Sequence, residues 1–174
     1  MTAPIYNRVA LIGLGLIASS MAHAMKAKGL AGEIVGYAKS AVSRRIAAEI
    51  GFIDRAAETA AEAVVGADLV VLAVPVGAMG DIAVEIGPHL MPGATVTDVG
   101  SVKQAVIDAV APHIPEGVHF VAGHPIAGTE HSGPRSGFAT LFHNRWWLLT
   151  PAEGTDPAAT ARLRKLCEGM GAKV

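Results

Sequence analysis

Short apolar runs alternate along the chain with longer segments whose apolar residues recur at helical spacing. The clearest run, Leu69–Val74, is apolar at every position and ends at Pro75, which is typical of a parallel strand buried on both faces. Further strands are predicted at 9–12, 33–37, 94–98, 118–122 and 146–150. Helical patterns lie between them at 17–28, 41–50, 76–89, 102–110 and 157–169, with a short helix after Thr59. This alternation predicts an α/β fold with a doubly wound, mainly parallel sheet and right-handed connections.

Several short patterns mark the expected ends of these elements. Gly29 is placed to end the first helix, and Thr59–Glu62 has the spacing of a capping box. Asp156–Pro157 supplies a cap and a first-turn proline for the last helix. Ser101–Gln104 has the spacing of another capping box, so a helix cap is one interpretation of Ser101. Residues 172–174 resemble the beginning of a further strand.

A glycine-rich turn joins the first predicted strand to the first helix. Its sequence is Gly13-Leu14-Gly15-Leu16-Ile17-Ala18. Gly13 permits a sharp bend, Gly15 lets a pyrophosphate approach the backbone, and the small Ala18 lets the helix pack against the strand. The free N–H groups at the helix start, among them those of Leu16 and Ile17, would face an anion. The pattern favours a dinucleotide site in a Rossmann-type domain over the alternative, an ordinary glycine-rich turn.

The end of the second predicted strand bears on the choice of cofactor. Dinucleotide-binding domains usually carry an Asp or Glu there that bonds the adenosine ribose, whereas this chain has Ala38. Lys39, Ser40 and Arg44 follow, and their charges and hydroxyl suit a ribose 2′-phosphate. The alternative, weighed equally, is that Ser40 caps a helix over 41–50 and the cations are solvated. We therefore expect NADP or NAD as cofactor, with a slight preference for NADP.

Four separate pieces of the sequence are expected to meet at one edge of the sheet. Gly13, Pro75, Ser101 and His124 each follow a predicted strand, and Val74 ends one. Ligands of doubly wound folds bind beyond the carboxyl ends of the strands. The segment 123–134 is rich in glycine and proline and is predicted to be an irregular, functional loop.

His124 is the candidate base of this loop. A histidine before a proline is restricted to extended backbone and can take a proton from a substrate hydroxyl. The alternative is a loop histidine that is hydrogen-bonded to nearby backbone. A metal site formed by His124, Glu130 and His131 is disfavoured because their spacing matches no known ligand pattern, and no metal is predicted.

Composition limits the classes of protein that remain. With 174 residues, 51% hydrophobic and 17% charged, the chain is expected to form one dinucleotide-binding domain over residues 1–174. A net charge of -1 argues against nucleic acid or an anionic membrane as partner and favours a small-molecule substrate. Cys167 is the only cysteine, so no intrachain disulfide can form. We expect a cytoplasmic protein, because neither a signal segment nor an apolar run of membrane-spanning length is present.

Four motifs resemble the prephenate and arogenate (cyclohexadienyl) dehydrogenases of tyrosine biosynthesis. They are the turn at 13–18, Asp98-Val99-Gly100-Ser101-Val102-Lys103, Gly123-His124-Pro125-Ile126-Ala127-Gly128-Thr129-Glu130, and Leu141-Phe142 with Asn144-Arg145-Trp146-Trp147. Together they span nearly the whole chain. The histidine-proline motif is much more specific than the glycine turn, which many dehydrogenases share.

The resemblance implies a reaction and three site residues. His124 would be the base on the ring hydroxyl, Ser101 would bond that hydroxyl near the nicotinamide, and Glu130 would organise or gate the substrate pocket. The implied reaction is oxidative decarboxylation of prephenate to 4-hydroxyphenylpyruvate, or of arogenate to tyrosine, with hydride transfer to NAD(P).

The chain departs from this family in two places. The acidic residue at the second strand is missing, which bears on NAD specificity. The family's helical C-terminal domain, which dimerises and completes the substrate site, is absent from the 174 residues, so we expect a homodimer only for a full-length form and little turnover here. The alternatives are a cofactor-binding or sensing module without turnover, and another β-hydroxyacid dehydrogenase.

Overall fold

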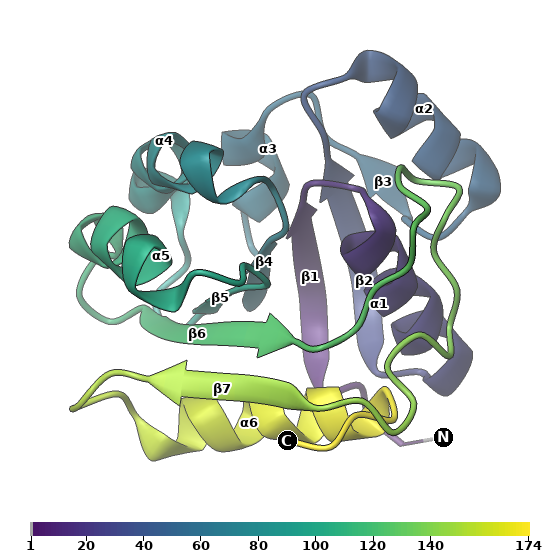
Figure 1. The fold of residues 1–174 in the computed structure, drawn as a ribbon. Helices are drawn as coiled ribbons and strands as arrows, with labels where there is room; N and C mark the ends of the chain where they lie inside the picture. The colour runs from purple at the N-terminus through teal and green to yellow at the C-terminus, as the bar shows by residue number, and fades with distance from the viewer. Residues whose placement is uncertain (1) are drawn as a thin grey trace.

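One seven-stranded sheet organises the structure, a computed structural model that describes residues 2–174 (Figure 1). The strands are β1 (Tyr6–Ile12), β2 (Ala31–Tyr37), β3 (Arg55–Ala56), β4 (Leu69–Leu72), β5 (Thr95–Asp98), β6 (His119–Pro125) and β7 (Trp147–Pro151). Their order in the sheet is β3-β2-β1-β4-β5-β6-β7, and only the β6–β7 pair is antiparallel. This arrangement confirms the predicted doubly wound, mainly parallel fold.

Helices cover both faces of the sheet. They are α1 (Leu16–Lys28), α2 (Ala41–Ile50), α3 (Ala60–Val64), α4 (Val76–Ile86), α5 (Lys103–Val110) and α6 (Pro157–Gly169), with short 3-10 turns at Gly87–His89 and Ala111–His113. Figure 1 shows α4 and α5 together on one side of the sheet, with α1 and α6 on the other side. The second 3-10 turn continues α5 directly.

The core has two layers because the side chains of a strand alternate between the two faces of a sheet. In β1, Val9 and Leu11 contact the layer that includes α1 and α6, whereas Ala10 and Ile12 contact the layer that includes α3, α4 and α5. β4 lies beside β1, and all four of its residues are buried, as the continuous apolar run predicts.

Most of the predicted helix ends are confirmed. Gly29 ends α1 in the left-handed conformation, where glycine has no Cβ to clash. The Ser40 hydroxyl accepts the Ser43 N–H at 3.3 Å at the start of α2. The Asp156 carboxylate accepts the Ala158 N–H at 2.9 Å at the start of α6. Thr59 likewise caps α3, although the carboxylate of Glu62 accepts the Glu58 N–H instead of the Thr59 N–H.

The structure corrects three predicted boundaries. The strand predicted over residues 69–74 ends at Leu72, where the chain turns toward α4. β6 continues through His124 to Pro125, so the predicted irregular loop does not begin at Gly123. The reason is its antiparallel pairing with β7, which is non-local and joins Gly123 to Leu149 and His124 to Leu148. The predicted strand at 172–174 is reduced to a single bridge pair between Trp146 and Lys173.

Two further features concern the expected environment of the chain. The Cys167 thiol is buried in α6, and this burial raises its pKa. Within residues 2–174, no helix combines the length and the apolar composition that crossing a bilayer requires.

Asp68 joins β1 to α6 at the amino end of β4. Its carboxylate is 8% exposed and accepts hydrogen bonds from the Asn7 and Arg8 N–H groups at 2.9 and 2.8 Å. It also accepts a hydrogen bond from the Arg162 guanidinium at 2.9 Å, and that guanidinium lies 4.2 Å from the centre of the Tyr6 ring. One carboxylate therefore holds two distant segments together.

We predict that Asp68→Ala lowers the free energy of unfolding by about 3 kcal/mol, because three donors lose a largely buried acceptor. Urea denaturation monitored by circular dichroism measures this change. Asp81→Ala, on the exposed side of α4, is the control and should change the free energy by less than about 0.5 kcal/mol. Equal effects of the two substitutions would show that the Asp68 bonds add no net stability.

Candidate active site

The glycine turn at the end of β1 has no room for a side chain at its first position. Gly13 has a φ of 101°, and a Cβ built there would lie 2.5 Å from the carbonyl oxygen of Ala73. The Gly13 N–H donates to the Tyr37 carbonyl at 2.7 Å, which fixes the turn against the end of β2. The bend required by the sequence pattern is therefore present, and only glycine fits it.

The start of α1 suits an anion such as the pyrophosphate of a dinucleotide. Gly15 is the N-cap, no side chain caps the helix, and the first turn contains no acidic residue. A Cβ at Gly15 would have no heavy atom within 4 Å, so the space over the turn is open. Leu16 and Ile17 begin the helix with N–H groups that point out of its end. Ala18 is fully buried, as expected for a small residue at the contact between helix and strand.

The residues after β2 were interpreted from the sequence either as a helix cap with solvated cations or as a site for a ribose 2′-phosphate. Ser40 caps α2, as one alternative holds. The Arg44 guanidinium is nevertheless not simply solvated, because it donates to the carbonyls of Ala38 and Lys39 at 2.7 and 3.3 Å and lies 6.0 Å from the centre of the Tyr37 ring. A positive charge is thus held at the end of β2, where a ribose would lie in a domain of this type.

Val74 and Pro75 follow β4, beside the glycine turn. The Ala73 N–H donates to the Ile12 carbonyl at 2.7 Å, so the chain leaves β4 next to the end of β1. Pro75 is the N-cap of α4 and is exposed, whereas Val74 is half-buried. Both lie at the same edge of the sheet as Gly13.

A buried ion pair lies at the carboxyl ends of β5 and β6. The Asp98 side chain is fully buried and forms a short contact with the Lys103 ammonium. Its carboxylate also accepts the Gly100 N–H at 2.9 Å and the Gly123 N–H at 3.1 Å, and Lys103 donates to the Gly123 carbonyl at 2.6 Å. Both backbone groups of Gly123, the residue before His124, are therefore held by this pair.

His124 is half-buried near the end of β6 and faces Leu148 across the strand pair. Cross-strand partners lie on the same face of a sheet, so its imidazole shares a face with Leu148, which is 46% exposed. Pro125 is buried and continues the strand, and the Ile126 N–H donates to the Trp146 carbonyl at 2.7 Å. The backbone of the candidate base is thus held by pairing with β7 on one side, while the β5–β6 pairing ends at Val121.

Ser101 does not cap α5, so the capping-box prediction is wrong. The helix begins at Lys103 with Val102 as its N-cap and without a side-chain cap. Because Asp98 binds both Gly100 and Lys103, it determines how the chain enters the helix. The Ser101 side chain is exposed, one residue from Gly100 and therefore close to the cluster that holds Gly123. Its proposed contact with a substrate hydroxyl stays a prediction.

Glu130 lies in the long connection between β6 and β7. Its carboxylate is 83% exposed and lies 3.2 Å from the His131 imidazole. Further along this connection the Phe138 N–H donates to the Ser20 hydroxyl at 3.1 Å, so the segment crosses α1 (Figure 1). The role of Glu130 in a substrate pocket stays a prediction. Within residues 2–174, no group of three His, Cys, Asp or Glu side chains is arranged to hold a metal ion.

Sequence reasoning assigned no role to Asp98 and Lys103, although both stand in one of the recognised motifs. An acidic residue that ends a buried apolar strand, with a lysine five positions later at the start of a helix, was the available signal. A buried carboxylate needs a partner, and the helix turn brings that lysine back over the strand end.

The edge of the sheet, the turn at Gly13 and the uncapped start of α1 define a Rossmann-type nucleotide-binding domain. The family model described as "Prephenate dehydrogenase, nucleotide-binding domain" matches residues 21–174. The chain therefore belongs to the prephenate dehydrogenase family, as the sequence resemblance predicted.

Individual relatives agree with this family. Cyclohexadienyl dehydrogenase of Zymomonas mobilis is 38% identical over 170 residues, covering 98% of this chain and 58% of that protein. Prephenate dehydrogenase of Bacillus subtilis is 34% identical, covering 95% of this chain and 45% of that protein. The chain thus spans about half the length of these curated relatives.

Solved structures show the same fold. Prephenate dehydrogenase from Aquifex aeolicus, in complex with hydroxyphenyl propionate and NAD+, is 31% identical with a TM-score of 0.88, covering 97% of this chain and 58% of that one. Synechocystis arogenate dehydrogenase is 32% identical with a TM-score of 0.87, covering 95% of this chain and 58% of that one.

We predict that Asp98→Ala lowers the free energy of unfolding by about 3 kcal/mol, because the Lys103 ammonium, on a side chain that is 18% exposed, would lose its counter-charge. Chemical denaturation measures this loss. Asp108→Ala is the matched control, since Asp108 is exposed and accepts only a surface hydrogen bond from Gln104 at 2.8 Å. A loss for Asp98→Ala no larger than that of the control would contradict the assignment of a stabilising pair.

Proposed function

We propose that the protein catalyses the oxidative decarboxylation of prephenate, arogenate or both, with NAD(P) as hydride acceptor, in tyrosine biosynthesis. The family supports the dehydrogenase class. The prephenate and arogenate dehydrogenases among the similar proteins support this pair of substrates. Because the chain spans about half the length of these relatives, the complete activity is proposed for a full-length form, as a cytoplasmic homodimer.

The observation that carries the proposal is the fixed position of His124. The buried Asp98–Lys103 pair binds both backbone groups of Gly123, and β7 pairs with His124 from the other side. These contacts fix the backbone that carries the imidazole at the carboxyl edge of the sheet, so little backbone freedom is lost when a substrate binds. Such preorganisation is what proton transfer during the reaction requires.

The chain's own residues would divide the chemistry among them. The His124 imidazole accepts the proton of the ring hydroxyl, and the Ser101 hydroxyl hydrogen-bonds that oxygen. As the hydroxyl-bearing carbon is oxidised, the ring carboxylate leaves as carbon dioxide and its bonding electrons complete the aromatic ring. NAD(P), when bound, would accept the hydride that leaves the hydroxyl-bearing carbon, and the N–H groups at the start of α1 would hold its pyrophosphate.

The surroundings of His124 suit a cyclohexadiene ring. Leu148 lies opposite the histidine, and Ile126 and Trp146, joined by a backbone hydrogen bond, lie two residues further along the strands. These three apolar side chains are 46%, 46% and 56% exposed. We propose that they contact the ring while Glu130, in the connection that follows β6, organises or gates the pocket.

The first test concerns the cofactor. The Arg44 guanidinium at the end of β2 leads us to predict that NADP binds at least as tightly as NAD. Arg44→Ala should weaken NADP binding by about tenfold and NAD binding by much less, because only NADP carries the 2′-phosphate. Calorimetric titration of both cofactors measures the ratio of their affinities.

Arg45→Ala is the matched control for this experiment. Arg45 is exposed on the same helix and pairs with Glu49 at 3.7 Å. Its substitution should leave the ratio of the two affinities unchanged. A clear preference of the unchanged protein for NAD, unaffected by Arg44→Ala, would rule out the NADP proposal.

The second test concerns the base, in a full-length form. We predict that His124→Asn lowers turnover by about 10²–10⁴ and barely changes cofactor affinity, the range expected for a lost general base. The turnover of the unchanged enzyme should rise with pH while the imidazole loses its proton, because only neutral imidazole can accept another. Steady-state kinetics across pH measure both effects.

His89→Asn is the control for the base, because His89 is an exposed histidine in the 3-10 turn after α4, away from the carboxyl edge of the sheet. Its replacement should keep turnover within about threefold of the unchanged enzyme, as expected for a surface substitution. If His124→Asn also kept near-normal turnover and the same pH profile, His124 would not be the base.

A further inference from the structure

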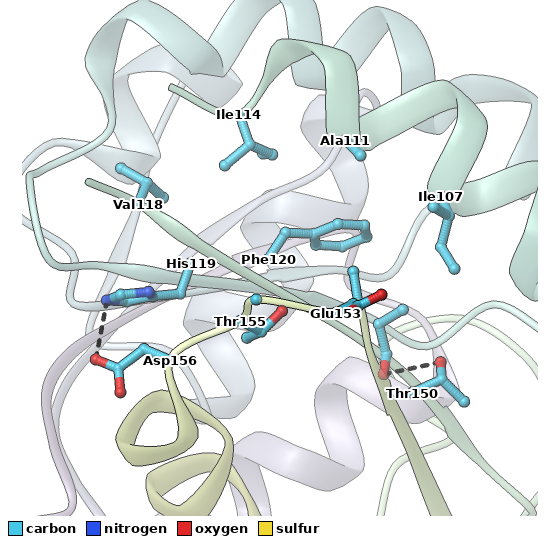
Figure 2. Close-up of a pocket in the computed structure, with 13 residues that line it drawn as sticks. Ile107, Ala111, Ile114, Val118, His119, Phe120, Thr150, Glu153, Thr155 and Asp156 are labelled. Atoms are coloured by element: carbon cyan, nitrogen blue, oxygen red, sulfur yellow. Dashed lines mark hydrogen bonds and ion pairs between the residues drawn. The ribbon is translucent and has the colours of Figure 1, made fainter. Parts of the chain in front are cut away.

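A cavity of about 300 Å³ lies between α5 with its 3-10 turn and the β6–β7 pair (Figure 2). Phe120 crosses the centre of this view, with Ile107, Ala111 and Ile114 on the α5 side. Val118 adds to the apolar lining. A volume of this size and an apolar wall are typical of sites for small molecules.

The opposite side of the cavity carries negative charge. Glu153 and Asp156 line it together with His119, and none of its lining side chains within residues 2–174 is a lysine or an arginine. Asp156 is held in place, since one carboxylate oxygen accepts the Ala158 N–H at 2.9 Å and the other lies 4.0 Å from the His119 imidazole. Glu153 forms no hydrogen bond or ion pair inside the described part of the chain. With His119 neutral, the lining carries two negative charges.

The cavity and the candidate active site lie on the same face of β6, and the lining of the cavity ends at the Ala122–Thr150 pair, two residues before the His124–Leu148 pair. Phe120 and His124 lie on the same face of β6, because side chains alternate along a strand, and four residues separate them by about 13 Å. The glycine turn and the start of α1 belong to strands further along the sheet. The centre of the cavity, at Phe120, therefore lies away from the proposed positions of the cofactor and the substrate ring.

We propose that this cavity binds a small organic ammonium ion with a compact apolar body and without a carboxylate. The apolar body would lie against Phe120 and Ile114, and the ammonium would lie at the Glu153 carboxylate, while Asp156 adds negative charge at the His119 end of the cavity (Figure 2). An anion of the same size would be repelled by these two carboxylates, and a neutral molecule would gain only the apolar contact. The hydroxyl of Thr150, on the cavity wall, is a further acceptor for the ammonium.

The experiment compares three probes of similar size at pH 8 and low salt. Benzylamine, benzyl alcohol and benzoate are titrated into the protein, and amide chemical shifts are followed by NMR. Benzylamine should bind at least threefold more tightly than benzyl alcohol and more tightly still than benzoate, and should shift the amides of Phe120, Thr150 and Glu153. The amides of Gly15 and Ser101 should not move.

Two variants test whether the Glu153 carboxylate attracts the ammonium of the probe. Glu153→Gln should weaken benzylamine binding by about threefold, a modest factor because the carboxylate is partly solvated. Glu153→Lys should abolish the preference for benzylamine over benzoate. Glu116→Gln, an exposed carboxylate outside the cavity, is the matched control and should have no effect. Equal affinity for the three probes, shifts elsewhere, or equal effects of Glu153→Gln and Glu116→Gln would overturn the proposal.

Discussion

The buried pair of Asp98 and Lys103 is the interaction on which the geometry of the candidate active site depends. Removing two charges from water costs several kcal/mol per ion, which their attraction offsets only when other hydrogen bonds satisfy both groups. Here the carboxylate also accepts two backbone N–H groups, and the ammonium also donates to a carbonyl. Because those bonds join β5, α5 and β6, the pair positions the residue next to His124.

The antiparallel strand β7 contributes residues to two places on one face of the sheet. It pairs with β6 over five residues and so places Leu148 beside His124 and Thr150 beside Ala122. The first pair belongs to the candidate active site, and the second lines the acidic cavity. A single strand pair therefore contributes residues both to the candidate active site and to the cavity.

The amino-acid sequence by itself determined the features that depend on local periodicity and on special backbone requirements. The buried run of β4, the bend at Gly13 and the caps at Ser40 and Asp156 follow from the chemistry of a few neighbouring residues. The histidine-proline motif was likewise sufficient to indicate the family, because specific residues at fixed spacing carry that information.

Only the tertiary structure decided features that depend on partners far away in the chain. Local spacing predicted a cap at Ser101, but the buried Asp98 carboxylate binds Gly100 and Lys103 and changes how α5 begins. Local composition predicted a loop from Gly123, but pairing with β7 keeps His124 and Pro125 in the strand. The cavity likewise is lined by residues of α5 and of the turn after β7, which are far apart in the chain. Contacts of this kind are set by the topology of the sheet, which no short stretch of sequence encodes.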